Sequence, residues 1–189
     1  MSTVFETTVD GFGRVGFAPV DPAADAELLH SWVTEDRARF WGMLDAGRAD
    51  VQEIYERLDT LSTHHAYLVR RDGTPVALIQ TYEPEADRVG ECYPVAPGDL
   101  GLHLFLGPAA DGAVPGFSAA LVSAVLRFLF DGLGARRLVA DPDAANVKAI
   151  ARLVRSGFTL GPLVTLPEVR LPEVFLPAKQ AQLAFRTRP

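Results

Sequence analysis

A chain of 189 residues, of which 48% are hydrophobic, has enough apolar material for one sizeable core, so we expect a single domain over residues 1–189. The net charge of −6 is spread along the chain, which argues against nucleic-acid binding and suits a cationic small-molecule partner. No basic leader with an apolar stretch opens the chain and no apolar run reaches membrane-spanning length, so we expect a cytoplasmic protein without a membrane partner.

The first third of the chain is predicted to be largely helical. Residues 15–20 form a short strand, and a helix follows from Pro22, a residue type that is favoured at helix starts. Apolar residues at helical spacing indicate further helices around residues 39–44 and 50–61.

A β-hairpin and a long loop are predicted next. Strands at residues 66–70 and 76–82 flank the turn sequence Asp72-Gly73-Thr74-Pro75, which favours antiparallel pairing. Residues 83–100 contain several prolines and glycines with little periodicity. A connection of this length is often functional.

The second half alternates strands and helices. The expected order is strand 101–106, loop 107–116, helix 117–133, strand 137–140, helix 146–156, and strands 159–166 and 180–185. This order predicts a mixed α/β sheet with a parallel crossover near its middle. Between the last two strands the sequence LPEV occurs twice, at Leu166 and Leu171, and its prolines favour an extended path.

The loop that opens the helix at residue 117 is a candidate anion site. Free backbone N–H groups at a helix start suit a pyrophosphate, and glycines let such a ligand approach closely. A flexible connection, with Ser118 as an ordinary first-turn residue, explains the same sequence equally well.

His103 is the candidate general base. It shares the less apolar face of its strand with Gly101 and Phe105. A lone strand histidine is more often a hydrogen-bonded core residue, yet histidine is the readiest base for an amine nucleophile.

The aspartates near residue 140 have ordinary structural explanations too. Asp143 is well placed as the N-cap of the helix that contains Asn146, and Asp141 suits a turn.

Cysteine and histidine usage argues against a disulfide and against a metal site. Cys92 is the only cysteine, which fits a reducing compartment. The adjacent His64 and His65 would point to opposite faces of a strand, and no third ligand accompanies them. We therefore expect no metal.

The chain resembles the siderophore-biosynthesis branch of the GNAT superfamily, which includes mycobactin lysine N-acyltransferases and aerobactin hydroxylysine acetyltransferases. The resemblance spans most of the chain and rests on motifs that occur in order: Trp32 with Arg39-Phe40-Trp41, Gln80-Thr81-Tyr82-Glu83-Pro84, Gly98-Asp99-Leu100-Gly101-Leu102-His103, Phe128-Leu129-Phe130, Asp141-Pro142-Asp143-Ala144-Ala145-Asn146 and Gly157-Phe158.

The resemblance implies a GNAT fold, with a mixed central sheet whose two parallel strands splay apart between flanking helices. It also implies direct acyl transfer from acetyl-CoA or another acyl-CoA to a lysine-type, N-hydroxylated amine. His103 would be the general base and Asp143 its acidic partner. The implied acyl-CoA-binding residues are Leu104, Phe105, Leu106, Gly112, Gly116, Phe117, Ser118 and Asn146. Candidates for the amine side are Trp32, Trp41, Gln80, Tyr82 and Tyr93.

Two features depart from the family pattern. The usual phosphate-binding loop is replaced by residues 111–118, and Asp141 stands where relatives carry a glutamate. Aminoglycoside 6'-N-acetyltransferases and other small-amine acetyltransferases are the nearest alternative, against which His103 argues, because a polycationic sugar favours a carboxylate on the central strand. A non-catalytic protein that binds acyl-CoA is the second alternative. Acyl length, the amine and the oligomeric state are left open.

Overall fold

The structure, a computed structural model, describes residues 2–109, 114–171 and 174–189. It contains two compact units: unit 1 holds the chain up to Gln80 together with Leu104–Phe128, and unit 2 holds Thr81–His103 and Leu129–Pro189. The strands β4 (Thr74–Tyr82) and β5 (Asp99–Leu106) each contribute residues to both units. One mixed sheet runs in the order β1-β2-β3-β4-β5-β6-β10-β7, which confirms the predicted fold class.

Unit 1 is built on antiparallel strands. β1 (Phe5–Val9) pairs with β2 (Gly13–Pro19), and β2 pairs with β3 (His64–Arg71). The turn from β3 to β4 has positive φ at Asp72 (47°) and Gly73 (89°), which is the backbone of the predicted tight hairpin turn. β1 is an addition to the predicted elements.

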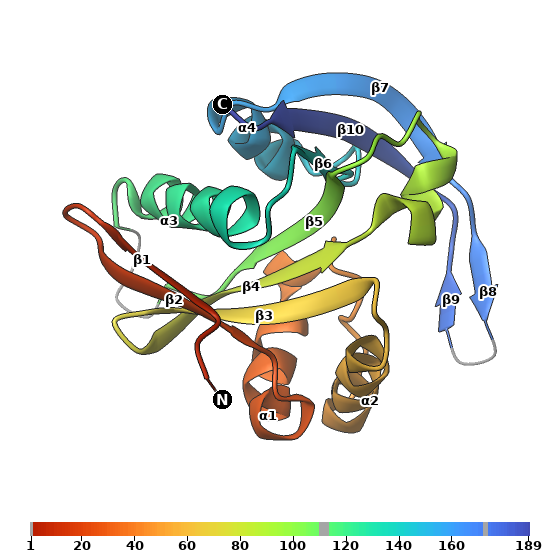
Figure 1. Cartoon of the computed structure of the whole chain (residues 1–189). Coiled ribbons are helices and arrows are strands. Elements are labelled where there is room, and N and C mark those ends of the chain that lie inside the picture. Colours follow the sequence, from red (N-terminus) through yellow and green to blue (C-terminus); the bar gives the residue numbers. More distant parts are fainter. Residues whose placement is uncertain (1, 110–113, 172–173) are drawn as a thin grey trace. The chain divides into compact units, whose positions relative to one another are not determined.

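Two helices lie together on one side of β3 and β4 (Figure 1). α1 (Pro22–Val33) begins at the N-cap Asp21, whose side chain accepts from the Ala24 N–H, and α2 (Arg48–Asp59) follows. Their apolar faces form a core together with the strands, and its large members include Leu29, Trp32, Tyr55, Leu68, Leu78 and Phe105.

The helix expected around residues 39–44 is absent. A single 3-10 turn, η1 (Asp36–Ala38), is followed by turns. Gly42 has φ of 87°, a left-handed conformation that interrupts a right-handed helix. The aromatic spacing there reflects packing of Trp41 on the core instead.

The helix α3 (Phe117–Arg127) closes unit 1 near β1 and β2 (Figure 1). The Phe128 ring stacks on Phe17, with ring centroids 4.4 Å apart. The predicted helix continues beyond α3 as a π-helical turn, Phe128–Gly132, rather than as one regular helix.

Unit 2 contains the parallel pair of strands. β5 runs parallel to β6 (Arg137–Ala140), while β10 (Lys179–Thr187) is antiparallel to β6 and to β7 (Thr159–Leu166). α4 (Val147–Arg155) lies between β6 and β7 in the chain. The long loop after β4 carries two short 3-10 turns, η2 (Pro84–Ala86) and η3 (Arg88–Glu91).

The duplicated LPEV sequence forms an arm that extends from unit 2 (Figure 1). β8 (Val169–Leu171) and β9 (Val174–Leu176) pair only with each other among the residues that the structure describes. The first copy connects the end of β7 to the start of β8, and residues 172 and 173 of the second copy lie outside the described residues. Residues 169–171 and 174–176 are extended, as predicted for this segment.

Candidate functional site

His103 lies in the middle of β5, on the face that it shares with Gly101. Its side chain is 37% exposed. The Tyr82 ring packs against it, with ring centroids 5.1 Å apart. His103 is therefore supported by a buried aromatic side chain while part of its own ring remains open to solvent.

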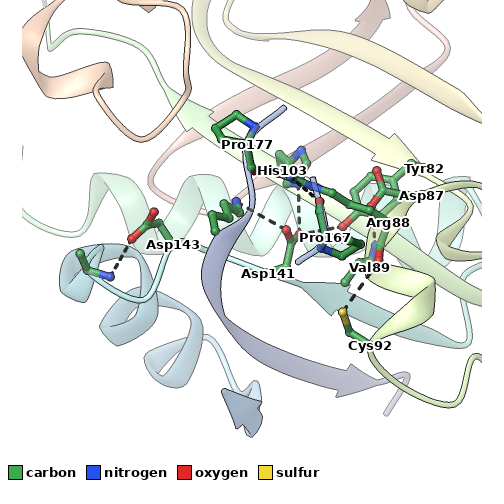
Figure 2. A network of polar contacts seen from close by, with 12 residues as sticks. Tyr82, Asp87, Arg88, Val89, Cys92, His103, Asp141, Asp143, Pro167 and Pro177 are labelled. Atoms are coloured by element: carbon green, nitrogen blue, oxygen red, sulfur yellow. Dashed lines mark hydrogen bonds and ion pairs between the residues drawn. The ribbon is translucent and has the colours of Figure 1, made fainter. Parts of the chain in front are cut away.

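The imidazole of His103 contacts a buried carboxylate. Its Nε2 lies 3.1 Å from Oδ1 of Asp141, whose side chain is only 4% exposed (Figure 2). The Tyr82 hydroxyl donates to the same oxygen at 2.7 Å. The Nζ of Lys179 lies 3.7 Å from Oδ2 of Asp141. One carboxylate thus connects residues from β4, β5 and β10.

Asp141 is held in its ionised form. Burial alone would raise the pKa of Asp141, but His103, Lys179 and the Tyr82 hydroxyl together outweigh burial and lower that pKa to about 2. Burial and the neighbouring Asp141 carboxylate raise the pKa of Tyr82 well above its ordinary value, so its hydroxyl remains a donor.

The Asp141 contact also determines the tautomer of His103. An ionised carboxylate only accepts hydrogen bonds, so the Nε2 that faces Asp141 carries a proton. In the neutral ring, Nδ1 is then the basic nitrogen. This arrangement can accept one proton at Nδ1 and stabilise the resulting imidazolium through Asp141.

Asp143 has a different environment from the one predicted. Its Oδ1 accepts from the Ala145 N–H at 2.8 Å, and its side chain lies apart from the Asp141 network (Figure 2). The N-cap of α4 is Asn146, whose Oδ1 accepts from the Ala149 N–H, so the prediction that Asp143 caps this helix is wrong. The turn formed by residues 143–145 places the cap at Asn146, three residues further along the chain than expected.

The recorded pairing between the two parallel strands ends at Gly101. β6 pairs with β5 through Asp99, Leu100 and Gly101, and then ends at Ala140, whereas β5 continues to Leu106. Among the described residues, the edge of β5 that carries Leu104, Phe105 and Leu106 has no recorded pairing with β6.

One carbonyl on this edge has a side-chain partner. The Gly107 N–H donates to the Val76 carbonyl at 2.8 Å, so the Leu106 carbonyl of the same trans peptide points the opposite way. Nη1 of Arg37 donates to that carbonyl at 2.6 Å, and its guanidinium lies over the Phe105 ring. Arg37 was not among the residues singled out from the sequence.

The predicted anion site at α3 is partly described. Gly116 has φ of 78° and precedes the helix, which starts at Phe117. Ser118 is exposed in the first turn, and the Phe117 ring packs on Phe12. Gly112 lies outside the described residues.

The predicted amine-side residues occupy two environments. In unit 1, Trp32 is 4% exposed and both it and Trp41 pack on Phe105, while Nε2 of Gln80 donates to the Tyr55 hydroxyl at 3.3 Å. In unit 2, Tyr82 binds Asp141 as described. Tyr93 donates to Asp99 there at 2.9 Å, away from any contact with His103 that the structure records.

Two features of the site were missed by sequence reasoning. Asp141 was assigned to a turn, although an aspartate directly after a short buried strand is a recognisable signal for a side chain at a sheet edge. Lys179 carried no signal, because its approach to Asp141 depends on how β10 pairs with β6.

No group of three or more His, Cys, Asp or Glu side chains is arranged to hold a metal ion in the described ranges. None of the helices in the described part of the chain is both long and apolar enough to cross a membrane.

Curated relatives of the chain include three acetyltransferases. It is 25% identical over 142 residues to N-hydroxyputrescine acetyltransferase of Acinetobacter baumannii, covering 75% of this chain and 66% of that protein. It is 28% identical over 146 residues to N(6)-hydroxylysine O-acetyltransferase of Escherichia coli, covering 76% of this chain and 46% of the relative. It is also 28% identical over 181 residues to an aminoglycoside N(6')-acetyltransferase of Klebsiella pneumoniae, covering 87% and 82%.

Structural similarity supports the same fold. A solved structure of AAC(6')-Ib in complex with paromomycin and acetyl-CoA matches with a TM-score of 0.72 at 24% identity, covering 92% of this chain and 93% of that one. The sequence profile of the family described as "Acetyltransferase (GNAT) domain" matches residues 21–166, which include parts of both units. The chain therefore belongs to the GNAT acetyltransferase-domain family.

Proposed function

We propose that this protein is an acyl-CoA-dependent N-acyltransferase that acts on a lysine-type, N-hydroxylated amine, as in siderophore biosynthesis. Two relatives are named for hydroxylated amines, N-hydroxyputrescine and N(6)-hydroxylysine. The chain spans only 66% and 46% of their lengths, so the residues of the site must carry the argument.

The observation that carries the proposal is the contact between His103 and the buried Asp141. A partly exposed imidazole that has one nitrogen fixed on a carboxylate is suited to remove a proton from an amine. We assign the role of acidic partner to Asp141 rather than to Asp143, because Asp141 is the aspartate in contact with the ring.

Acyl transfer to an amine forms a C–N bond, breaks the thioester C–S bond so that CoA leaves as its thiolate, and requires the amine to lose a proton. His103 Nδ1 accepts that proton, and Asp141 stabilises the imidazolium through Nε2. Tyr82 keeps Asp141 in place through its hydroxyl. When bound, acyl-CoA supplies the activated carbonyl.

The chain has suitable groups to hold an acyl-CoA. Backbone groups on the edge of β5 that carries Leu104 and Phe105 offer acceptors and donors for an amide-bearing arm. The N-terminus of α3, with Gly116 and Ser118, offers N–H groups to a phosphate. Gly112 and Asn146 remain predicted contacts.

We propose Trp41 and Gln80, which are half-buried, as contacts of the amine. Trp32 and Tyr82 are buried and would act by supporting neighbouring side chains. The net charge of −6 suits a small cationic acceptor better than a nucleic acid, and we place the protein in the cytoplasm.

The test is release of free CoA from acetyl-, succinyl- and longer acyl-CoA with N-hydroxylated and plain diamines, lysine derivatives and an aminoglycoside. Wild type is compared with His103→Gln and with the control His65→Gln, which changes an exposed histidine. We expect turnover on a hydroxylated lysine-type amine that falls at least about 100-fold in His103→Gln and not in the control.

Other outcomes would redirect the assignment. Turnover only on the aminoglycoside would favour the aminoglycoside acetyltransferases as the enzyme class. The Klebsiella pneumoniae relative belongs to that class, and its alignment covers 87% of this chain and 82% of the relative. Acyl-CoA binding without turnover on any amine would contradict the enzymatic proposal.

A further inference from the structure

We propose that Lys179 is a positioning residue that balances the charge of the buried Asp141 carboxylate and thereby keeps His103 neutral and able to accept a proton. This proposal rests on the function proposed for His103. Lys179 acts on the imidazole through Asp141, whose carboxylate both side chains contact.

The backbone holds Lys179 at this position. Beyond the end of β6, the Gln182 N–H donates to the Pro142 carbonyl and the Ala144 N–H donates to the Gln180 carbonyl, both at 3.0 Å. Asp143 and Ala181 form a bridge between these two hydrogen bonds. The turn that carries Asp141 is therefore fixed against the first residues of β10, which begins at Lys179.

The charges explain why a second cation is needed. A buried carboxylate with a single histidine partner strongly favours protonation of that histidine, because the resulting ion pair compensates the buried charge. An imidazolium in the resting state cannot remove a proton from the amine. Lys179, whose side chain is 28% exposed, supplies the compensating positive charge at 3.7 Å from Oδ2, while His103 binds Oδ1.

Other charged and titratable groups surround the network within unit 2. Asp87 and Tyr93 act electrostatically on Tyr82, and Arg88, Glu91 and Asp141 act on Cys92. Of the residues with a recorded side-chain contact to Asp141, however, only Lys179 and His103 can carry positive charge. The effect of removing Lys179 should therefore fall mainly on His103.

The first measurement does not depend on activity. The ring resonances of His103 are followed by NMR against pH and are assigned by their loss in His103→Gln. We expect the titration midpoint of the His103 ring to rise by about one pH unit in Lys179→Met, because the Asp141 carboxylate then has no second cation. Lys179→Arg should keep the wild-type midpoint.

The matched control is Arg188→Met. It also removes one positive charge from unit 2, but from the exposed ion pair between Arg188 and Asp131. Its His103 midpoint should stay at the wild-type value. A shift as large as that of Lys179→Met would assign the effect to net charge and overturn the proposal.

The second measurement is kcat/KM against pH on one amine. With a higher midpoint, Lys179→Met should lose about tenfold in kcat/KM at pH values below both midpoints and approach wild type at high pH. A loss of equal size at every pH, with an unchanged His103 midpoint, would show a merely structural role and contradict the proposal.

Two further outcomes are distinguishable. If Lys179→Met does not fold, Lys179→Gln replaces it, and failure of both neutral variants to fold would overturn the charge-balancing role. If wild type transfers no acyl group, the proposed function fails, while the NMR midpoints still decide the role of Lys179.

Discussion

The Tyr82 ring fills the space that a side chain on Gly101 would need. A Cβ atom at position 101 would lie 2.1 Å from Cε2 of Tyr82. The absence of a side chain at Gly101 thus allows the Tyr82 ring to lie against β5 and its hydroxyl to reach Asp141.

Gly101→Ala should therefore displace Tyr82 and break its hydrogen bond to Asp141. We expect a loss of about 3 kcal/mol in the free energy of unfolding, measured by urea denaturation, from overpacking and a lost buried hydrogen bond. The control is Gly16→Ala in β2, where the new Cβ would lie 3.4 Å from Thr3 and should cost under about 1 kcal/mol. Equal losses in the two variants would contradict the packing argument.

Asp141→Asn should remove an acid-sensitive part of the stability. The folded state lowers the pKa of Asp141 from 3.8 to about 2, so its stabilising effect is present above about pH 4 and is lost as pH falls toward 2. We expect this pH-dependent part to amount to about 2 kcal/mol. The difference in unfolding free energy between wild type and Asp141→Asn, measured from pH 7 to pH 2, should be smaller at pH 2 than at pH 7 by about 2 kcal/mol. A constant difference across the range would refute the assignment.

Arg137→Met should be strongly destabilising. The Asp99 side chain, which is 2% exposed, accepts two hydrogen bonds from Arg137 at 2.7 and 2.6 Å. Removing the guanidinium leaves a buried carboxylate without its cation, which we expect to cost about 3 kcal/mol. Thermal and urea unfolding would measure this, and Arg188→Met, at an exposed pair, should cost under about 0.5 kcal/mol.

Arg88→Met should loosen the arm formed by β8 and β9. Nη1 of Arg88 donates to the Pro167 carbonyl at 3.1 Å and to the Pro177 carbonyl at 2.8 Å (Figure 2). We expect amide hydrogen exchange in the arm to accelerate about tenfold, corresponding to about 1.4 kcal/mol of local stability. Arg170→Met, within the arm and paired with Glu168 on the surface, should leave exchange within about twofold.

Local signals in the sequence were sufficient to predict much of the fold and the strand on which His103 lies. The turn at Asp72 and Gly73 could be predicted because it needs positive φ at two adjacent positions, and Asp-Gly is a local sequence that adopts this backbone. Side chains alternate between the two faces of a strand, so the sequence of β5 alone placed His103 and Gly101 on one face.

The partners of His103 depend on contacts distant in sequence. Asp141 and Asp143 are equivalent by residue type, and the conformation of the turn decides which of them contacts His103. Lys179 lies 38 residues beyond Asp141 in the chain, and only the pairing of β10 with β6 brings them together. The prediction of a helix at residues 39–44 was wrong, because the apolar residues there pack a turn on the core and do not form the face of a helix.

The arm has a consequence for how this chain can vary in length. Arg88 donates hydrogen bonds to the backbone just before β8 and just after β9. Both acceptors are backbone carbonyl groups, which every residue type supplies. The hairpin between these two points pairs with itself and supplies no strand to the main sheet in the described structure. Because β8 and β9 share no recorded pairing with the main sheet in the described part of the chain, we expect changes in the length of the arm to leave the register of the sheet unchanged.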